Sequence, residues 1–227
     1  MLSITLQLID RYPIRQHPLI VKFVKGCYNL NPPKPKYNVT WDPNRVLNFM
    51  VSLGDNSALP ISVLVGKLAT LLALATPLRV SELVSISFLS VKFSENWVQF
   101  ALSKLRKAQR NGPVQSFTHP ACPESETCPV TTLRSYVDCT GTNRPSNNEG
   151  MLFISMIAPF GSVKGSTGGR QIKNFLREAE INTAVFSAHS NRSLASSLTV
   201  GRGLSIDAVL RLAIGPAKRR LAAFTIV

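Results

Sequence analysis

The chain has 227 residues, of which 44% are apolar and 17% charged, a globular composition that excludes a wholly disordered protein. Lysine and arginine number 26 against 12 acidic residues, which gives a net charge of +14. This excess is typical of proteins that bind a polyanion, and a merely solvated basic surface is the alternative interpretation.

Residues 1–40 are rich in proline and basic residues, with Asn-Pro-Pro-Lys-Pro-Lys at 31–36. Prolines at this density favour extended chain, so we expect a basic arm over residues 1–40 rather than a folded domain. The first residues carry no basic leader, and their apolar stretch is too short for a signal peptide.

Two helices are expected after this arm. Asp42 followed by Pro43 is typical of a capped helix start, and apolar residues then recur at helical spacing until Gly54. A second helix is expected over residues 62–75, and it is apolar almost all round, as in a helix at the centre of a core. Lys67 in its middle argues against a membrane span, so we expect no membrane partner.

A corner and a hairpin follow. Thr76-Pro77 ends the apolar helix, and Ser81 can cap a short helix at 82–86, which places Arg79 at the corner between two helices. Strand-like runs at 97–102 and 114–118 flank the turn signal Asn111-Gly112. We therefore expect a β-hairpin with a cationic tip, and the alternative interpretation is that Lys104, Arg106, Lys107 and Arg110 only form a solvated tip.

The remaining elements are mostly helical. Pro129 opens an expected helix, residues 140–150 are predicted to form a polar loop, and residues 151–155 are predicted to be extended. A further helix is expected after Gly168 and Gly169, and the last two are expected at 189–200 and 205–214.

The cysteines do not predict a metal site or a disulfide framework. The four cysteines lack paired C-x-x-C spacing, so free thiols in a reducing intracellular compartment are the better interpretation. His119, Cys122 and Cys128 fit no standard zinc spacing and are interrupted by prolines. We expect a turn-rich loop there, with no bound metal.

Three features in a fixed order carry a resemblance to a known family. They are Arg79-x-x-Glu82 after a buried helix, a lysine-bearing hairpin, and His189-x-x-Arg192 on a late helix. This order resembles the catalytic domain of the tyrosine recombinases, over about residues 17–215. It is most similar to the recombinases of DIRS-like and Ngaro-like retrotransposons, through His17-Pro18-Leu19, Asn31-Pro32-Pro33-Lys34-Pro35, Thr40-Trp41-Asp42, Phe186-x-Ala188-His189 and Ile206-Asp207-Ala208-Val209-Leu210.

The resemblance implies a phosphoryl-transfer chemistry that needs no metal and no small-molecule cofactor. In the family, a tyrosine oxygen attacks the scissile phosphate and forms a 3′-phosphotyrosyl link. Arg79 and Arg192 are then expected to bind phosphate oxygens with forked guanidinium donors. His189 is expected to be an acid/base or to donate a hydrogen bond to the phosphate.

A hairpin lysine would protonate the leaving oxygen, and Glu82 would hold Arg79 rather than act as an acid. Lys107 matches the family's turn best, and Lys104 is the alternative. Further DNA contacts are expected from Lys104, Arg106, Lys107, Arg110, Arg170 and Lys173. The implied partner is double-stranded DNA, with self-association on it, in the nucleus.

The sequence departs from the family where its nucleophile should be. The only tyrosines are Tyr12, Tyr28, Tyr37 and Tyr136, so none follows Arg192. The family's tyrosine would fall near Thr225 or Ile226, and a threonine hydroxyl is a much weaker nucleophile. Pro216 also stands where the family has tryptophan or histidine. We therefore expect a domain that binds DNA without forming the covalent intermediate.

The expected fold is mainly α with a small antiparallel β-sheet or hairpin, a C-terminally incomplete tyrosine recombinase catalytic domain. The expected organisation is a basic arm at 1–40, this domain at 41–215 and a divergent tail at 216–227. The expected function is that of a recombinase- or integrase-type DNA-binding domain, inactive for lack of the tyrosine. The alternative is a non-enzymatic basic nucleic-acid-binding protein.

Overall fold

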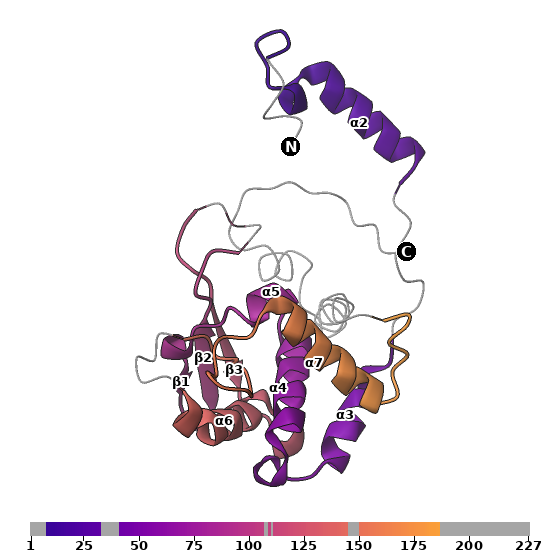
Figure 1. Cartoon of the computed structure of the whole chain (residues 1–227). Helices are drawn as coiled ribbons and strands as arrows, with labels where there is room; N and C mark the ends of the chain where they lie inside the picture. The colour runs from indigo at the N-terminus through magenta and orange to yellow at the C-terminus, as the bar shows by residue number, and fades with distance from the viewer. Residues whose placement is uncertain (1–7, 33–40, 107–108, 110, 145–149, 187–227) are drawn as a thin grey trace. The chain divides into compact units, whose positions relative to one another are not determined.

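The computed structural model describes residues 8–32, 41–106, 109, 111–144 and 150–186 (Figure 1). It divides the chain into two compact units, Met1–Val39 and Thr40–Val227. The helices at 189–200 and 205–214 that the sequence predicts lie outside the described residues.

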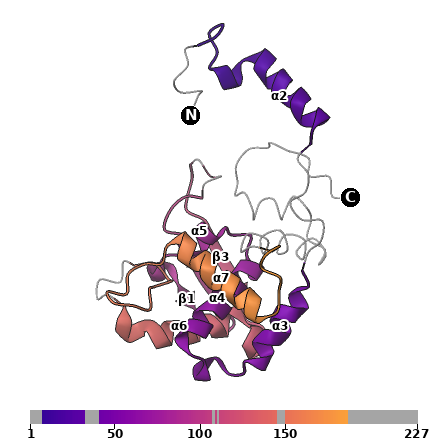
Figure 2. The ribbon, with the colours of Figure 1, turned by 45° about the vertical axis from the view of Figure 1, so that its right-hand side comes forward.

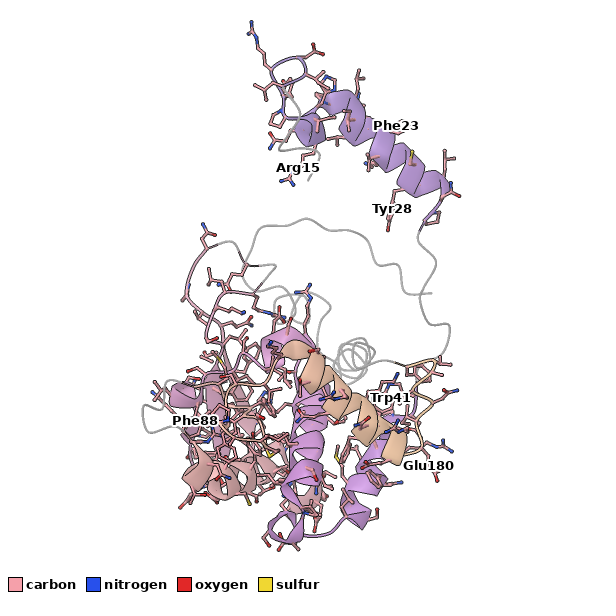
Figure 3. The ribbon with its side chains drawn as sticks, viewed as in Figure 1. Arg15, Phe23, Tyr28, Trp41, Phe88 and Glu180 are labelled. Carbon is pink, nitrogen blue, oxygen red and sulfur yellow. The ribbon has the colours of Figure 1, made fainter. Side chains whose placement is uncertain are left out.

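The first unit contains a helix where an extended arm is expected. Helix α2 spans Pro18–Leu30, with Pro18 at its first turn. The expectation of extended chain is wrong for this segment because Pro18 occupies the first helical position, where a proline is tolerated, and no proline stands in the interior of the helix. The helix buries none of its residues, and Phe23 and Tyr28, labelled in Figure 3 with Arg15, are among its exposed apolar side chains.

The second unit is built around an apolar helix. Helix α4 spans Ile61–Ala75, and most of its residues are buried, as its uniformly apolar sequence predicts. Helix α3, Pro43–Ser52, precedes it and begins as predicted, with the Asp42 carboxylate accepting a hydrogen bond from the backbone N–H of Asn44 at 2.9 Å. Trp41, labelled in Figure 3, is part of the same core.

Helices α6 and α7 both pack against α4. They span Pro129–Thr140 and Gly165–Glu178, and Figures 1 and 2 show α7 lying along α4. Short 3-10 helices lie at Ile14–Gln16, Asn56–Ala58, Phe88–Ser90, Ser125–Thr127 and Gly141–Asn143. Within the described part of the chain, no helix has the length and apolar character to span a membrane.

The predicted hairpin is present and belongs to a three-stranded antiparallel sheet of order β1-β2-β3. Strands β2 and β3 span Trp97–Ala101 and Ser116–Pro120, and Phe100 pairs with Phe117. Strand β1 spans Lys92–Phe93. The sequence does not predict it, because two residues are too few to show the alternation of apolar and polar residues that marks a strand. The fold is therefore about half helical with a small antiparallel sheet, as the sequence predicts.

Two glycines allow helices to approach closely. A Cβ at Gly168 in α7 would lie 2.6 Å from Cγ1 of Val84, and one at Gly66 in α4 would lie 3.1 Å from Cδ2 of Phe175. The sequence places Gly168 before a helix, but α7 begins at Gly165 and includes it. Close packing, rather than a helix start, explains this glycine.

Lys67 is a lysine in the middle of the core. Its residue is 0% exposed, and its Nζ donates to the carbonyl oxygen of Met50 at 3.4 Å. Burial lowers the pKa of its ammonium, and more distant acidic side chains only partly oppose this effect. The amine is thus held by one backbone acceptor within apolar surroundings.

Candidate functional site

The candidate site begins at the corner between α4 and α5. Helix α5 spans Val80–Leu83, and Arg79 is its N-cap residue. The Glu82 carboxylate accepts a hydrogen bond from the backbone N–H of Arg79, with Oε2 at 2.9 Å. This capping interaction satisfies the backbone N–H of the N-cap residue. The expected cap at Ser81 is wrong, because α5 begins at Val80 and Ser81 lies inside it.

Glu82 joins two guanidinium groups. Its Oε1 lies 3.0 Å from Nη1 of Arg79, and its Oε2 lies 3.0 Å from Nη2 of Arg106. The predicted contact between Glu82 and Arg79 is therefore present. Only 7% of the Glu82 side chain is exposed, whereas 34% of the Arg79 side chain is. The carboxylate is buried, and Arg79 keeps an open face.

Arg106 lies in the interior and not on a solvated hairpin tip. Its side chain is 0% exposed. Its Nη2 also donates to the carbonyl oxygen of Pro77 at 3.2 Å, and its Nη1 donates to Oε1 of Gln115 at 3.1 Å. The expectation that Arg106 contacts DNA directly is therefore wrong. The run of basic residues in the loop does not predict the contact between Arg106 and Glu82, because Glu82 is 24 residues away in sequence.

The cluster keeps a net positive charge. Burial would raise the pKa of the Glu82 carboxyl, but hydrogen bonds from Arg106 and Arg79, together with their charges, lower it overall. The carboxyl is therefore ionised at neutral pH, and one negative charge faces two guanidiniums. Because 34% of the Arg79 side chain is exposed, part of the positive charge of the cluster is open to solvent.

The loop between β2 and β3 carries both candidate lysines, of which the structure describes one. Lys104 is exposed, as a group that contacts a ligand must be. The predicted turn at 111–112 is supported by Gly112, whose φ of +97° lies in the left-handed region that favours glycine. Gln109 closes this turn by donating to the carbonyl oxygen of Pro113 at 2.6 Å. Lys107 and Arg110 lie outside the described residues.

Arg170 and Lys173 are both exposed on α7, as their expected role requires. The start of this helix lies beside α5, since a Cβ at Gly165 would be 3.6 Å from Cα of Ser81. Arg170 follows Gly169, whose Cβ would contact Val80. The structure thus brings α7 against the helix that Arg79 caps.

His189 and Arg192 lie outside the described residues, as do Pro216, Thr225 and Ile226. Of the expected site, the described residues bring together Arg79 and Glu82, add the unexpected Arg106, and leave Lys104 exposed on the loop. The second arginine and the histidine remain expectations from the sequence.

Tyr136 has a structural role. It is 0% exposed, and its hydroxyl oxygen accepts a hydrogen bond from the backbone N–H of Ile154 at 3.2 Å. Burial raises the pKa of its phenol, an effect that this hydrogen bond and the nearby Arg144 only partly offset. A buried phenol that resists ionisation is not placed to attack a phosphodiester.

The histidine and cysteines after β2 are placed by packing. His119 stacks on Phe100 with ring centroids 5.6 Å apart, and burial lowers its pKa. The Cys128 sulfur accepts a hydrogen bond from the backbone N–H of Cys122 at 3.1 Å. Over the described ranges, no three histidine, cysteine or acidic side chains gather as metal ligands would.

Comparison with solved structures identifies the fold. No family model and no curated protein sequence matches the chain. A crystal structure of XerA recombinase matches with a TM-score of 0.55 and 20% identity, covering 92% of this chain and 70% of that one. The XerH site-specific recombinase, bound to its difH substrate in a pre-cleavage complex, matches with a TM-score of 0.58 and 12% identity, covering 96% of this chain and 61% of that one.

These likenesses show the fold of a tyrosine recombinase catalytic domain. At 20% and 12% identity, they speak for the fold alone. This chain also spans less than two thirds of the XerH chain. The chemistry of the site must therefore be argued from its own residues.

Proposed function

We propose that this chain is a recombinase-type DNA-binding domain that grips the phosphate backbone of double-stranded DNA at Arg79. The observation that carries this proposal is the Arg79–Glu82–Arg106 cluster, in which Glu82 fixes a guanidinium whose side chain is still 34% exposed. A forked donor held in one geometry matches the oxygens of a phosphodiester. The net charge of +14 favours the same partner.

The recombinase fold supports a DNA partner in particular. The XerH neighbour was solved as a complex with its difH substrate. The retained elements include the Arg79 corner, the β2–β3 loop with Lys104, and the adjoining helix α7 with Arg170 and Lys173. Each would contribute phosphate contacts, which fix a protein's position on DNA without reading its sequence.

Further parts of the proposal rest on sequence resemblance. We infer that Arg192 and His189 complete the phosphate site and that Lys107 approaches the leaving oxygen, with Lys104 as the alternative. We also infer an origin in a DIRS-like retroelement, a nuclear location and self-association on DNA.

Replacing Arg79 with alanine is expected to weaken binding to a labelled DNA duplex about tenfold, the value of a charge-assisted hydrogen bond to phosphate. Fluorescence anisotropy at one fixed salt concentration measures this change, because salt alone alters phosphate binding. Arg45→Ala is the matched control, since Arg45 is exposed on α3 and does not belong to the cluster. Equal losses for the two variants would favour a non-enzymatic nucleic-acid-binding protein with no dedicated phosphate site.

The 227-residue chain is expected to form no covalent adduct with DNA. The residues after Tyr136 include no tyrosine, and Tyr136 itself is buried. Incubation with a radiolabelled nicked duplex, followed by denaturing electrophoresis, would detect a phosphotyrosyl link. A labelled protein band that disappears in Arg79→Ala would contradict the expected inactivity.

A further inference from the structure

We propose that Arg106 is a positioning residue that sets the direction of Arg79 and ties the lysine-bearing loop to it. This inference rests on the proposed phosphate-binding role of Arg79. Arg106 itself is 0% exposed at its side chain and so does not touch DNA. It acts through the groups that it holds.

The first argument is that one guanidinium holds both sides of the Arg79 corner. Nη2 of Arg106 donates to the carbonyl oxygen of Pro77, two residues before Arg79, at 3.2 Å. The same nitrogen donates to Oε2 of Glu82, three residues after Arg79, at 3.0 Å. The backbone of the corner and the carboxylate that binds Arg79 are therefore fixed by a single donor group.

The second argument concerns the loop. Nη1 of Arg106 donates to Oε1 of Gln115 at 3.1 Å, and the Gln115 carbonyl oxygen accepts from the backbone N–H of Leu102 at 3.3 Å. Both ends of the loop are thus joined near Arg106, and Lys104 lies only two residues before it. Hydrogen bonds from Arg106 therefore hold both the loop and the Arg79 corner.

The third argument is electrostatic. Without Arg106, the charge of Glu82 would neutralise that of Arg79 and weaken its attraction for phosphate. With Arg106 present, both guanidiniums share one carboxylate and a positive charge remains. Arginine suits this role because its planar fork can donate to Pro77, Glu82 and Gln115 at once, whereas an ammonium cannot match that geometry.

Arg144 offers a comparison within the same fold. It is partly buried, and it donates to the carbonyl oxygens of Met151 and Leu152 and to Oγ1 of Thr140. Its guanidinium lies over the ring of Phe88 at 3.9 Å. None of these partners is the carboxylate that holds Arg79, so Arg144→Gln is a matched control for the loss of an internal arginine.

The test is a double-mutant cycle between Arg106→Gln and Arg79→Ala. Duplex affinity is measured at a temperature where circular dichroism shows each variant folded. We expect Arg106→Gln to weaken binding about tenfold in the native background and clearly less once Arg79 is alanine, where only the loop that carries Lys104 is still affected. Arg106→Lys should recover part of the loss, and Arg144→Gln should leave affinity unchanged while lowering the unfolding temperature.

An equal loss from Arg106→Gln in both backgrounds would overturn the inference, as would unchanged affinity in the native background. If Arg106→Gln does not fold, Arg106→Lys in the same cycle decides by the same criteria. Failure of the proposed function is a separate outcome, in which Arg79→Ala itself binds DNA like the native chain.

Discussion

Replacing Glu82 with alanine is expected to lower the free energy of unfolding by about 3–5 kcal/mol, the typical cost of removing one partner of a buried ion pair. The Arg106 side chain is 0% exposed, so its guanidinium would lose its carboxylate with no access to water. Arg79 would also lose the acceptor for its backbone N–H. Urea denaturation at neutral pH measures the change.

The control for this variant is Glu124→Ala, which removes an exposed glutamate and should change stability by less than about 0.5 kcal/mol. Glu82→Gln keeps the shape of the side chain but removes its charge. Its loss of unfolding free energy should lie between those of Glu82→Ala and Glu124→Ala. A loss of less than about 1 kcal/mol for Glu82→Ala would mean that the two arginines find water or other partners, and it would contradict this account of the cluster.

The same carboxylate gives stability a dependence on acid pH. Since the folded pKa of Glu82 is lowered, its contribution is fully present above the unfolded pKa, about 4.3, and is lost as pH falls through the folded value. Below about pH 4, the native chain should lose stability that Glu82→Gln does not lose. Parallel declines in the two proteins would place the acid sensitivity in other carboxyls.

Phe175→Ala is expected to destabilise the domain by about 3–5 kcal/mol, the usual cost of deleting a buried aromatic ring. Phe175 is 2% exposed, and its ring meets that of Phe49 edge-on with centroids 5.3 Å apart. It also fills the space left by Gly66 in α4. The substitution would leave a cavity between α7 and α4. This cavity cannot close unless one of the two helices moves.

The control for this second variant is Leu89→Ala, since Leu89 is 63% exposed and should cost less than about 0.5 kcal/mol. The close contact between Gly66 and Phe175 also predicts that the effects of substitutions at these two positions are coupled. Gly66→Ala places a methyl where Phe175 stands, so it should be better tolerated when Phe175 is alanine. Strict additivity of the two substitutions would mean that α4 and α7 do not pack as described.

Local signals predicted most of the second unit. The cap at Asp42, the apolar run of α4, the turn at Gly112 and the helix start at Pro129 each depend on neighbours in sequence. Such signals act within a few residues, and the structure follows them. The small antiparallel sheet and the mainly helical fold were therefore accessible from sequence.

What the sequence could not predict depends on distant contacts. Arg106 looks like any other loop arginine until the fold brings it to Glu82, 24 residues away. The cap at Glu82 is by contrast a local contact, three residues from Arg79, and the sequence assigns it to Ser81 because it starts the helix at residue 82 and not at Val80. Helix α2 was missed for another reason, since flanking prolines gave the whole arm an extended appearance.

Chemical labelling of the buried Lys67 amine would report local opening of the domain. Reagents that acylate amines require contact with an unprotonated nitrogen, and this one is 0% exposed. Opening would return this amine to water and so restore its ordinary pKa, and it would then react as an exposed lysine does. Mass spectrometry of acylation at Lys67, compared with exposed Lys92, would time how often α4 leaves its packed surroundings.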